Sequence, residues 1–289
     1  MKTMSKENEI NLSKYNMDHE KRGIALIINI SKYDDPNPFE LEEREWSIKD
    51  VENLIKTLNY LEFDLDLPQN LTKSEIKERL KQIATEIDHG DFDCFLCVAM
   101  SHGNGDKIVT KDNEFIGFEE IMAPIKSCPS LVNKPKMFFF QACRGENKIE
   151  SRPSSACSTT SFKGASMNDT SPSSNLQSNV KKNIATNFNY ESDLIIYYST
   201  LPNHLSWSVD KNEGTIFIKS VCDVFAKAYK NLPNNLSLSQ MYTEINKSVS
   251  KTEQQISELL FRMTDEVYFL PKDVSKHFKL FTLRFLIFY

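Results

Sequence analysis

Residues 136–145 read Lys136-Met137-Phe138-Phe139-Phe140-Gln141-Ala142-Cys143-Arg144-Gly145, and this stretch decides the fold class. Its first half is an apolar run, which is typical of a β-strand buried on both faces of a sheet. Cys143 follows where the strand should end. A second apolar run, residues 95–100, is followed in the same way by His102. Because reactive residues collect beyond the carboxyl ends of such strands, we expect the thiol and the imidazole to lie close together.

A cysteine beside a histidine at a sheet edge indicates nucleophilic catalysis. A thiol attacks a carbonyl carbon as its thiolate, and a nearby base makes that thiolate. Gly103 would let backbone N–H groups approach a substrate closely. The alternative is that Cys143 is a buried core thiol and that His102 is an ordinary loop histidine. The residues that flank the pair favour the catalytic interpretation.

The rest of the chain alternates between strand and helix patterns. Apolar runs predict strands at residues 23–30, 94–100, 136–142, 193–199 and 266–270, and alternation of apolar and charged residues predicts one at 61–67 with one face in water. Apolar residues at helical spacing predict helices at residues 51–58, 76–87, 118–125, 217–228 and 238–249. Thr72 and Glu75 form a capping box before the second helix. This alternation predicts an α/β fold with a mostly parallel sheet and helices on both faces.

From about Glu146 to Ser192 the pattern stops, and Ser, Asn, Thr, Pro and Lys dominate. A structureless stretch of this length predicts a linker. We therefore divide the chain into five parts: an N-terminal segment 1–14, a catalytic part 15–146, a linker 147–192, a second part 193–271 and an apolar tail 272–289. The tail is too short to span a bilayer, and we expect no membrane partner.

Composition narrows the class of protein. The net charge of −5 is spread along 289 residues without a basic stripe, which argues against a nucleic-acid partner. The polar N-terminus has no signal-peptide core, so we expect a cytoplasmic protein whose six cysteines are free thiols. Cys94 and Cys97 match C-x-x-C, but on a strand they point to opposite faces. We expect them to pack in the core, and no metal site is predicted.

These motifs resemble the caspase family of cysteine peptidases. The likeness runs from Tyr15 to about Leu270 apart from the linker, and the pentapeptide that contains Cys143, with its upstream histidine, is specific for that family. Further anchors, weak alone, are Tyr198-Ser199-Thr200 and Ser206-Trp207. The resemblance implies a three-layer fold with a six-stranded sheet, split by the linker into large and small subunits. It also implies a homodimer that pairs through the last strand.

The resemblance implies an endopeptidase that cleaves proteins after aspartate in apoptosis, without a metal or organic cofactor. Cys143 would be the nucleophile. His102 would help to generate the thiolate and would protonate the leaving amine. The backbone N–H groups of Gly103 and Cys143 would hold the oxyanion, and such donors contribute about 10²–10³ in rate.

The substrate pocket that the resemblance implies departs from the family at one position. A buried carboxylate needs charged partners, and the family uses two arginines and a glutamine, here Arg44, Gln141 and the residue after Ser206-Trp207. That residue is Ser208. Losing a charge-assisted partner costs about 1.5–3 kcal/mol, so we expect weak or altered substrate binding. Trp207 would form a wall for the residue before the aspartate.

Two of these residues also have ordinary structural explanations. Arg44 stands among Glu42, Glu43 and Glu45 and would there form a surface ion pair. Trp207 would simply pack in the core. Both alternatives stay open at this point.

The linker holds one candidate processing site. Asp169 is its only aspartate, and we expect cleavage there by the chain itself or by an upstream activating protease. Thr170 after the cut is a poorer fit than Gly or Ser, and Asp169 is otherwise an ordinary solvated residue. Residues 250–258 leave little room for the loop that closes the substrate groove in caspases that act downstream. Together with the short N-terminal segment, these features resemble a short-prodomain, executioner-type caspase.

A second hypothesis is a poorly active caspase homologue that acts as a binding or decoy partner of an active caspase. Ser208, the short loop and the weak linker site favour it. The intact pair of His102 and Cys143 favours the enzyme, because a pure decoy needs neither residue.

Overall fold

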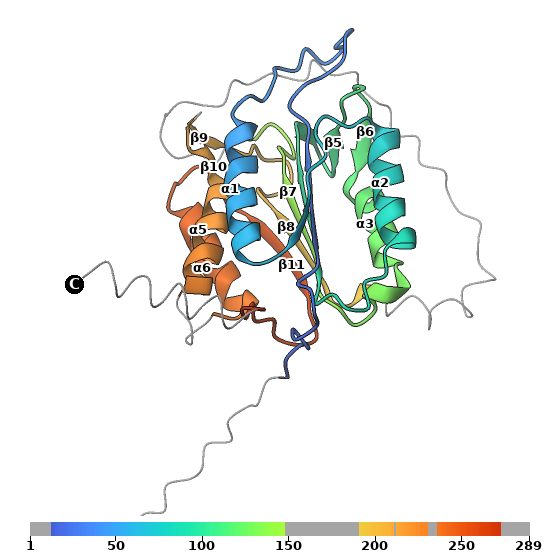
Figure 1. The fold of residues 1–289 in the computed structure, drawn as a ribbon. Helices are drawn as coiled ribbons and strands as arrows, with labels where there is room; N and C mark the ends of the chain where they lie inside the picture. Colours follow the sequence, from blue (N-terminus) through green and yellow to red (C-terminus); the bar gives the residue numbers. More distant parts are fainter. Residues whose placement is uncertain (1–12, 148–190, 211, 231–235, 273–289) are drawn as a thin grey trace, which may run out of the picture.

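The computed structural model describes residues 13–147, 191–210, 212–230 and 236–272. They form three layers, with helices on both sides of a central sheet (Figure 1). The order of the six strands across the sheet is β11-β8-β7-β3-β1-β2. All neighbouring pairs are parallel except β11 with β8. The predicted α/β fold with a mostly parallel six-stranded sheet is confirmed.

The sheet is built on three central strands in which every residue is buried. Its members are β1 (Ile24–Asn29), β2 (Asp64–Asp66), β3 (Phe95–Met100), β7 (Lys136–Gln141), β8 (Leu194–Tyr198) and β11 (Glu258–Arg262). Two small sheets lie outside it. They comprise β4 (Gly103–Asn104), β5 (Lys107–Val109) and β6 (Phe115–Gly117), and β9 (Ser208–Asp210) with β10 (Gly214–Thr215).

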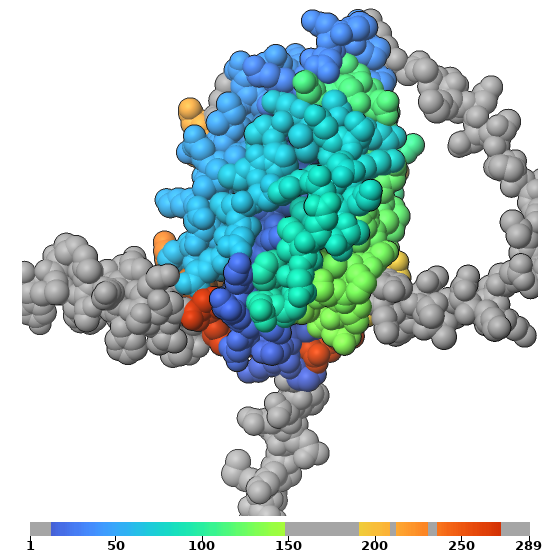
Figure 2. All heavy atoms as spheres, turned by 45° about the vertical axis from the view of Figure 1, so that its right-hand side comes forward, coloured from blue at the N-terminus to red at the C-terminus, as the bar shows by residue number. Residues whose placement is uncertain are grey.

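Helices α1 (Ser47–Tyr60), α5 (Ile216–Lys230) and α6 (Leu238–Ser250) cover one face of the sheet (Figure 1). Helices α2 (Lys73–Glu86) and α3 (Phe118–Lys126) cover the other face, and the short 3-10 helix Pro129–Leu131 follows α3. Figure 2 is turned so that this second face comes forward, and α2 lies across it in teal. The predicted capping box is present, because Glu75 N–H donates to Thr72 Oγ1 and the Glu75 carboxylate accepts from the Thr72 N–H.

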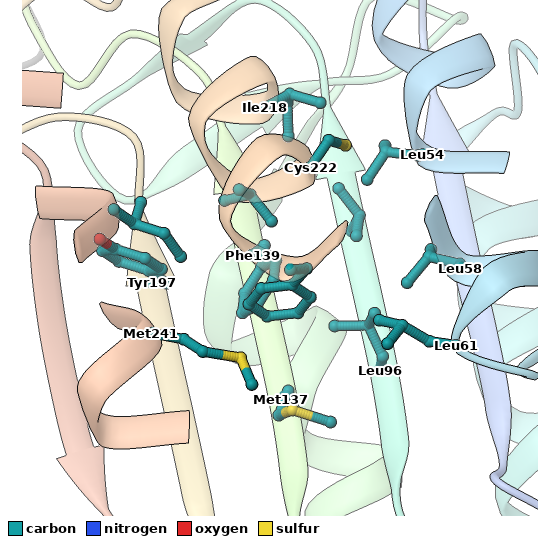
Figure 3. Close-up of a cluster of buried hydrophobic side chains, with 14 of the residues drawn as sticks. Leu54, Leu58, Leu61, Leu96, Met137, Phe139, Tyr197, Ile218, Cys222 and Met241 are labelled. Carbon is teal, nitrogen blue, oxygen red and sulfur yellow. The ribbon is translucent and has the colours of Figure 1, made fainter. Parts of the chain in front are cut away.

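The core has two halves because side chains of a strand alternate between faces. Met137 and Phe139 of β7 pack toward α5 and α6 with Leu54, Tyr197 and Met241 (Figure 3). Phe138 and Phe140 pack on the opposite side under α2 and α3. Burying one such side chain contributes about 1.5–3 kcal/mol. The run at 136–141 thus fixes the middle of the sheet.

The last strand lies elsewhere than predicted. It is β11, which pairs antiparallel with β8, whereas the predicted strand at 266–270 makes only an isolated bridge between Glu266 and Lys14. Val267 and Phe269 are buried and their neighbours are more exposed, which reproduces a strand pattern without a neighbouring strand to pair with. The strand predicted at 61–67 is also shorter, because Leu61 ends α1 as its C-cap.

Several predictions fall outside the described residues. They are the linker with Asp169, Cys157, most of the N-terminal segment and all but the start of the tail. Within the described part of the chain, no helix is long and apolar enough to cross a bilayer.

Candidate functional site

The predicted nucleophile and base lie at one edge of the sheet. Met100, the last residue of β3, pairs in register with Gln141, the last residue of β7. His102 and Cys143 each come two residues later, so the parallel register brings them to the same edge. Both line one small cavity of about 30 Å³. The predicted pocket residues line it too: Arg44, Gln141, Ser206, Trp207 and Ser208.

Cys143 is held by a segment from the second half of the chain. Its Sγ accepts a hydrogen bond from the Ser206 N–H at 3.4 Å, and the Ser206 carbonyl oxygen lies 3.8 Å from the sulfur. Burial raises the pKa of the Cys143 thiol, while the Ser206 hydrogen bond and the charge of Arg44 lower it by less. The resting nucleophile is therefore a neutral thiol.

His102 is a neutral imidazole, and one hydrogen bond defines its tautomer. Its Nε2 lies 2.9 Å from the carbonyl oxygen of Glu42, and a carbonyl oxygen only accepts. Nε2 therefore carries the proton and Nδ1 is the basic nitrogen. Burial lowers the pKa of His102 to about 4, and the charge of Arg44 adds to the effect. The ring of Tyr33 lies 5.6 Å away, centroid to centroid.

Gly103 is required by close backbone approach. A Cβ at this position would lie 2.8 Å from the carbonyl oxygens of Cys143 and Lys107 and 2.9 Å from the Cβ of Ala142. Any side chain would therefore push the histidine loop away from the cysteine loop. This packing against the cysteine loop is a second reason for glycine, beside the predicted approach of its backbone to a substrate, which stays a prediction.

Arg44 is a buried cation that forms no ion pair within the described residues, although its charge acts on the buried carboxyl of Asp50 and partly offsets the rise in the pKa of that group. The Arg44 side chain is 3% exposed. Nη1 donates to the carbonyl oxygen of Ile30 at 2.8 Å and to Oδ1 of Asn29 at 3.4 Å. The alternative prediction, a surface ion pair with neighbouring glutamates, is wrong because β1 and its following loop enclose the guanidinium. Arg44 also lines the cavity, and its positive charge there favours an anion.

Gln141 and Ser206 hold each other on the cavity wall. Gln141 Nε2 donates to Ser206 Oγ at 2.9 Å, and Gln141 Oε1 is buried without a partner in the described structure. Gln255 fixes the same segment, since its Oε1 accepts from the Trp207 N–H at 2.6 Å and its Nε2 donates to Ser199 O at 2.5 Å. The sequence does not indicate this role of Gln255, because the residue lies in a loop that contains no recognisable motif.

Asp50 is a second residue that sequence reasoning missed. It is buried in α1, and its Oδ1 accepts from the N–H of Thr215, another residue of the cavity wall, at 2.8 Å. Burial raises the pKa of Asp50 to about 6. An aspartate in the first turn of a helix is common, so its position along the sequence predicts only a favourable helix start.

Arg144 ties the cysteine loop to two other elements. Its guanidinium pairs with Asp106 at 2.7 Å and with Glu258, the first residue of β11. It also lies over the ring of Tyr198 at 4.1 Å from the centroid. The Arg144 side chain is buried, whereas the carboxylates of Asp106 and Glu258 are in contact with solvent. The position of Cys143 is thereby linked to the edge of the sheet.

The four described cysteines other than Cys143 are enclosed by the fold. All five described cysteines are free thiols, and Cys94, Cys97, Cys128 and Cys222 are buried. Burial raises the pKa of Cys94 and of Cys222 to about 12. The prediction that Cys94 and Cys97 pack in the core is confirmed.

Comparisons with known proteins find chains of similar sequence and fold. The family model described as "Caspase domain" matches residues 22–268. "Caspase drICE" of Drosophila melanogaster is 30% identical over 222 residues, which cover 76% of this chain and 59% of that protein. "Caspase-1" of Spodoptera frugiperda is 31% identical over 210 residues, which cover 72% of this chain and 62% of that protein. This chain thus spans about three fifths of the length of these two relatives.

A longer match and a solved structure extend the comparison. "Caspase-7" of Gallus gallus is 27% identical over 269 residues, covering 88% of this chain and 79% of that protein. The crystal structure of caspase-1 from Spodoptera frugiperda superposes with a TM-score of 0.70 at 25% identity, covering 90% of this chain and 96% of that chain.

Proposed function

The chain belongs to the caspase family, and we propose that it is a cysteine endopeptidase that cleaves proteins after aspartate in programmed cell death. One observation carries this proposal. A thiol, a neutral imidazole and a buried guanidinium that forms no ion pair among the described residues line the same cavity. The first two groups supply the chemistry, and the third selects the substrate side chain.

Arg44 supports selection of an acidic side chain. A buried charge is costly unless a partner of opposite charge is present. A substrate carboxylate would supply that partner, and a planar guanidinium can hold it with two parallel N–H bonds. Gln141 and Ser208 add polar groups that carry no charge. Because Ser208 replaces the family's second arginine, we propose a weaker preference for aspartate than two arginines would impose.

The resting protonation states define the order of proton transfers. Both Cys143 and His102 are neutral before substrate binds, so the thiol proton passes to Nδ1 of His102 as Sγ attacks the peptide carbonyl carbon. The imidazolium then donates this proton to the leaving amine as the C–N bond breaks. Water hydrolyses the thioester, with His102 again taking a proton. Backbone N–H groups of Gly103 and Cys143 would hold the oxyanion.

We further propose how the peptidase is organised. Two copies would pair through β11, a sheet edge on which Phe261 is 41% exposed. An upstream protease, or the chain itself, would cut the linker at Asp169. The protein would act in the cytoplasm as an executioner-type caspase with the domain division given above.

A decoy is the second candidate function. Ser208 favours it, because this residue lines the cavity where the family has an arginine. Such a protein would pair with an active caspase through β11 but would turn over substrate poorly.

Peptide hydrolysis distinguishes these functions. The purified chain, with its linker cut by an added protease, is incubated with matched peptides that carry Asp, Glu, Asn or Ala before the scissile bond. We expect cleavage of the aspartate peptide and none with Cys143→Ala. Hydrolysis no faster than that of the Cys143→Ala variant for every peptide would reject the peptidase and leave the decoy. A Ser208→Arg variant should raise kcat/KM for the aspartate peptide by about 10-fold or more.

A further inference from the structure

A groove separate from the catalytic cavity lies between α1 and α5. Its volume is about 530 Å³, within the range of about 300–1,000 Å³ that is typical of small-molecule sites. The two helices run side by side on the same face of the sheet (Figure 1). None of the residues that line this groove lines the cavity of Cys143. The proposed peptidase chemistry therefore makes no use of it.

The groove is lined by four lysines. Lys49 and Lys56 come from α1, and Lys219 and Lys230 come from α5. Two acidic residues, Glu213 and Asp223, also line it, so four positive and two negative charges leave a net charge of +2. The whole chain carries −5. The excess of cations is therefore local, and a cleft between helices focuses such a potential.

Two of the four lysines are already paired. Lys219 lies 3.0 Å from Asp223 and 3.7 Å from Glu213, and Lys49 lies 3.0 Å from Glu52. Lys56 and Lys230 make no ion pair within the residues that the structure describes. They are the two cations that a bound anion would neutralise.

The two helices that line the groove run in the same direction. Lys49 and Lys219 lie in the first turns of α1 and α5, and the rings of Tyr60 and Tyr229 meet near the last turns at 4.8 Å. The helices are therefore parallel, and the positive ends of their dipoles lie near Lys49 and Lys219, so at the other end the positive charge comes from the side chains of Lys56 and Lys230. The groove extends along α1 from Lys49 to Tyr60, eleven residues or about 16 Å.

The floor of the groove is uncharged. Cys222 and Thr57 are buried between the helices, and Cys222 faces the α1 residue Leu54 (Figure 3). Burial raises the pKa of Cys222 to about 12, so this thiol stays neutral. Ala226 and Tyr60 extend the apolar surface. An occupant should thus combine concentrated negative charge with an apolar part.

We propose that this groove binds an organic phosphate of nucleotide size. The phosphate oxygens would accept hydrogen bonds from the ammonium groups of Lys56 and Lys230. A lysine ammonium group is a compact point charge, which suits a phosphate. The organic part would cover Cys222 and Ala226 and contact the ring of Tyr60. An acidic peptide offers less charge in the same length of groove than a run of phosphates does.

Titration calorimetry tests this site with adenosine triphosphate as the probe, without Mg²⁺ and in the full chain carrying Cys143→Ala. We expect saturable binding with one site per chain. Lys56→Ala with Lys230→Ala should weaken it by about 10-fold or more. The matched control is Lys81→Ala with Lys251→Ala, which removes the same charge from exposed lysines outside the groove and should change the affinity less than about twofold.

The two halves of the probe decide what the groove recognises. Inorganic triphosphate should bind at least about 10-fold more weakly than adenosine triphosphate, and adenosine should not bind detectably. Absence of binding at millimolar probe, or equal losses in the groove variant and the control variant, would overturn the site. Inorganic triphosphate that binds as tightly as adenosine triphosphate would overturn the role of the organic part. Thermal melts of each variant without probe verify that it is folded.

Discussion

The backbone N–H of Ser206 donates a hydrogen bond to Sγ of Cys143 at 3.4 Å. The two residues are 63 positions apart, so the nucleophile from the first half of the chain is covered by a segment of the second half. The same segment supplies Trp207 and Ser208 to the cavity wall. Access to the sulfur and the shape of the pocket are thereby controlled by one short stretch.

Alkylation should show that the resting sulfur is a thiol. Because burial raises the pKa of Cys143, we expect its reaction with iodoacetamide to accelerate up to pH 9 and beyond. Since His102 is also neutral at rest, His102→Ala should leave this pH profile unchanged. Peptide mapping by mass spectrometry measures the rate at Cys143 alone. A plateau near pH 7 that disappears in His102→Ala would instead reveal a resting thiolate–imidazolium pair.

Gly103→Ala should abolish activity and destabilise the fold. The added methyl group would meet the backbone of Cys143 and Lys107 at 2.8 Å, and overpacking of this kind costs about 1–3 kcal/mol. Gly105→Ala is the matched control. A Cβ there meets nothing within 4 Å, but φ is +60°, so we expect a cost of about 1–2 kcal/mol with activity retained. Peptide hydrolysis and urea denaturation measure both effects, and an active Gly103→Ala enzyme would contradict the close approach.

Asp50→Asn should change how stability depends on pH. The pKa of Asp50 is raised from 3.8 to about 6 in the folded chain, so the unfolded chain releases this proton first as pH rises. Wild-type stability therefore falls between about pH 4 and pH 6, and this contribution stays lost above it. The variant lacks that fall.

Urea denaturation at pH 4, 5 and 7 measures the effect of Asp50→Asn. The free energy of unfolding of the variant minus that of the wild type should increase by on the order of 2–3 kcal/mol from pH 4 to pH 7. A difference that does not depend on pH would mean that Asp50 titrates as an exposed carboxylate.

Arg144→Ala should cost much more stability than Arg262→Ala. Arg144 is buried and joins Asp106, Glu258 and the ring of Tyr198, so we expect a loss of about 2–3 kcal/mol. Within the described ranges, the one ion pair of Arg262 is with Glu191 at the surface, and such pairs contribute about 0–1 kcal/mol. Chemical denaturation of both variants gives the comparison. Equal losses would show that the link between the cysteine loop and β11 is weak.

Local sequence patterns were sufficient to predict the central strands of the sheet. Residues 137–140 are all apolar because the strand is covered on both faces, so the sequence pattern matches the observed burial. The pattern at 266–270 was misleading for a physical reason. Val267 and Phe269 are buried as in a strand, but the sheet edge is already occupied by β11. Which segment pairs with β8 depends on contacts between distant residues.

The same contrast between local patterns and contacts of distant residues applies to the candidate site. The placement of Cys143, His102 and Gly103 at one sheet edge was predictable because each follows closely after the end of a buried strand. Asp50 and Gln255 were not, since each acts on a backbone group far along the chain. Asp50 accepts from Thr215, 165 positions away, and Gln255 accepts from Trp207, 48 positions away.

Covalent trapping tests most directly whether Cys143 attacks a carbonyl that Arg44 has selected. Two peptidyl acyloxymethyl ketones that differ only in their final residue, aspartate or alanine, are incubated with the linker-cut chain, and the adduct is mapped by mass spectrometry. We predict an adduct on Cys143 that forms about 10- to 100-fold faster with aspartate, and Arg44→Met should remove this preference. Equal rates for the two ketones in the wild type, or an adduct on another cysteine, would contradict the account.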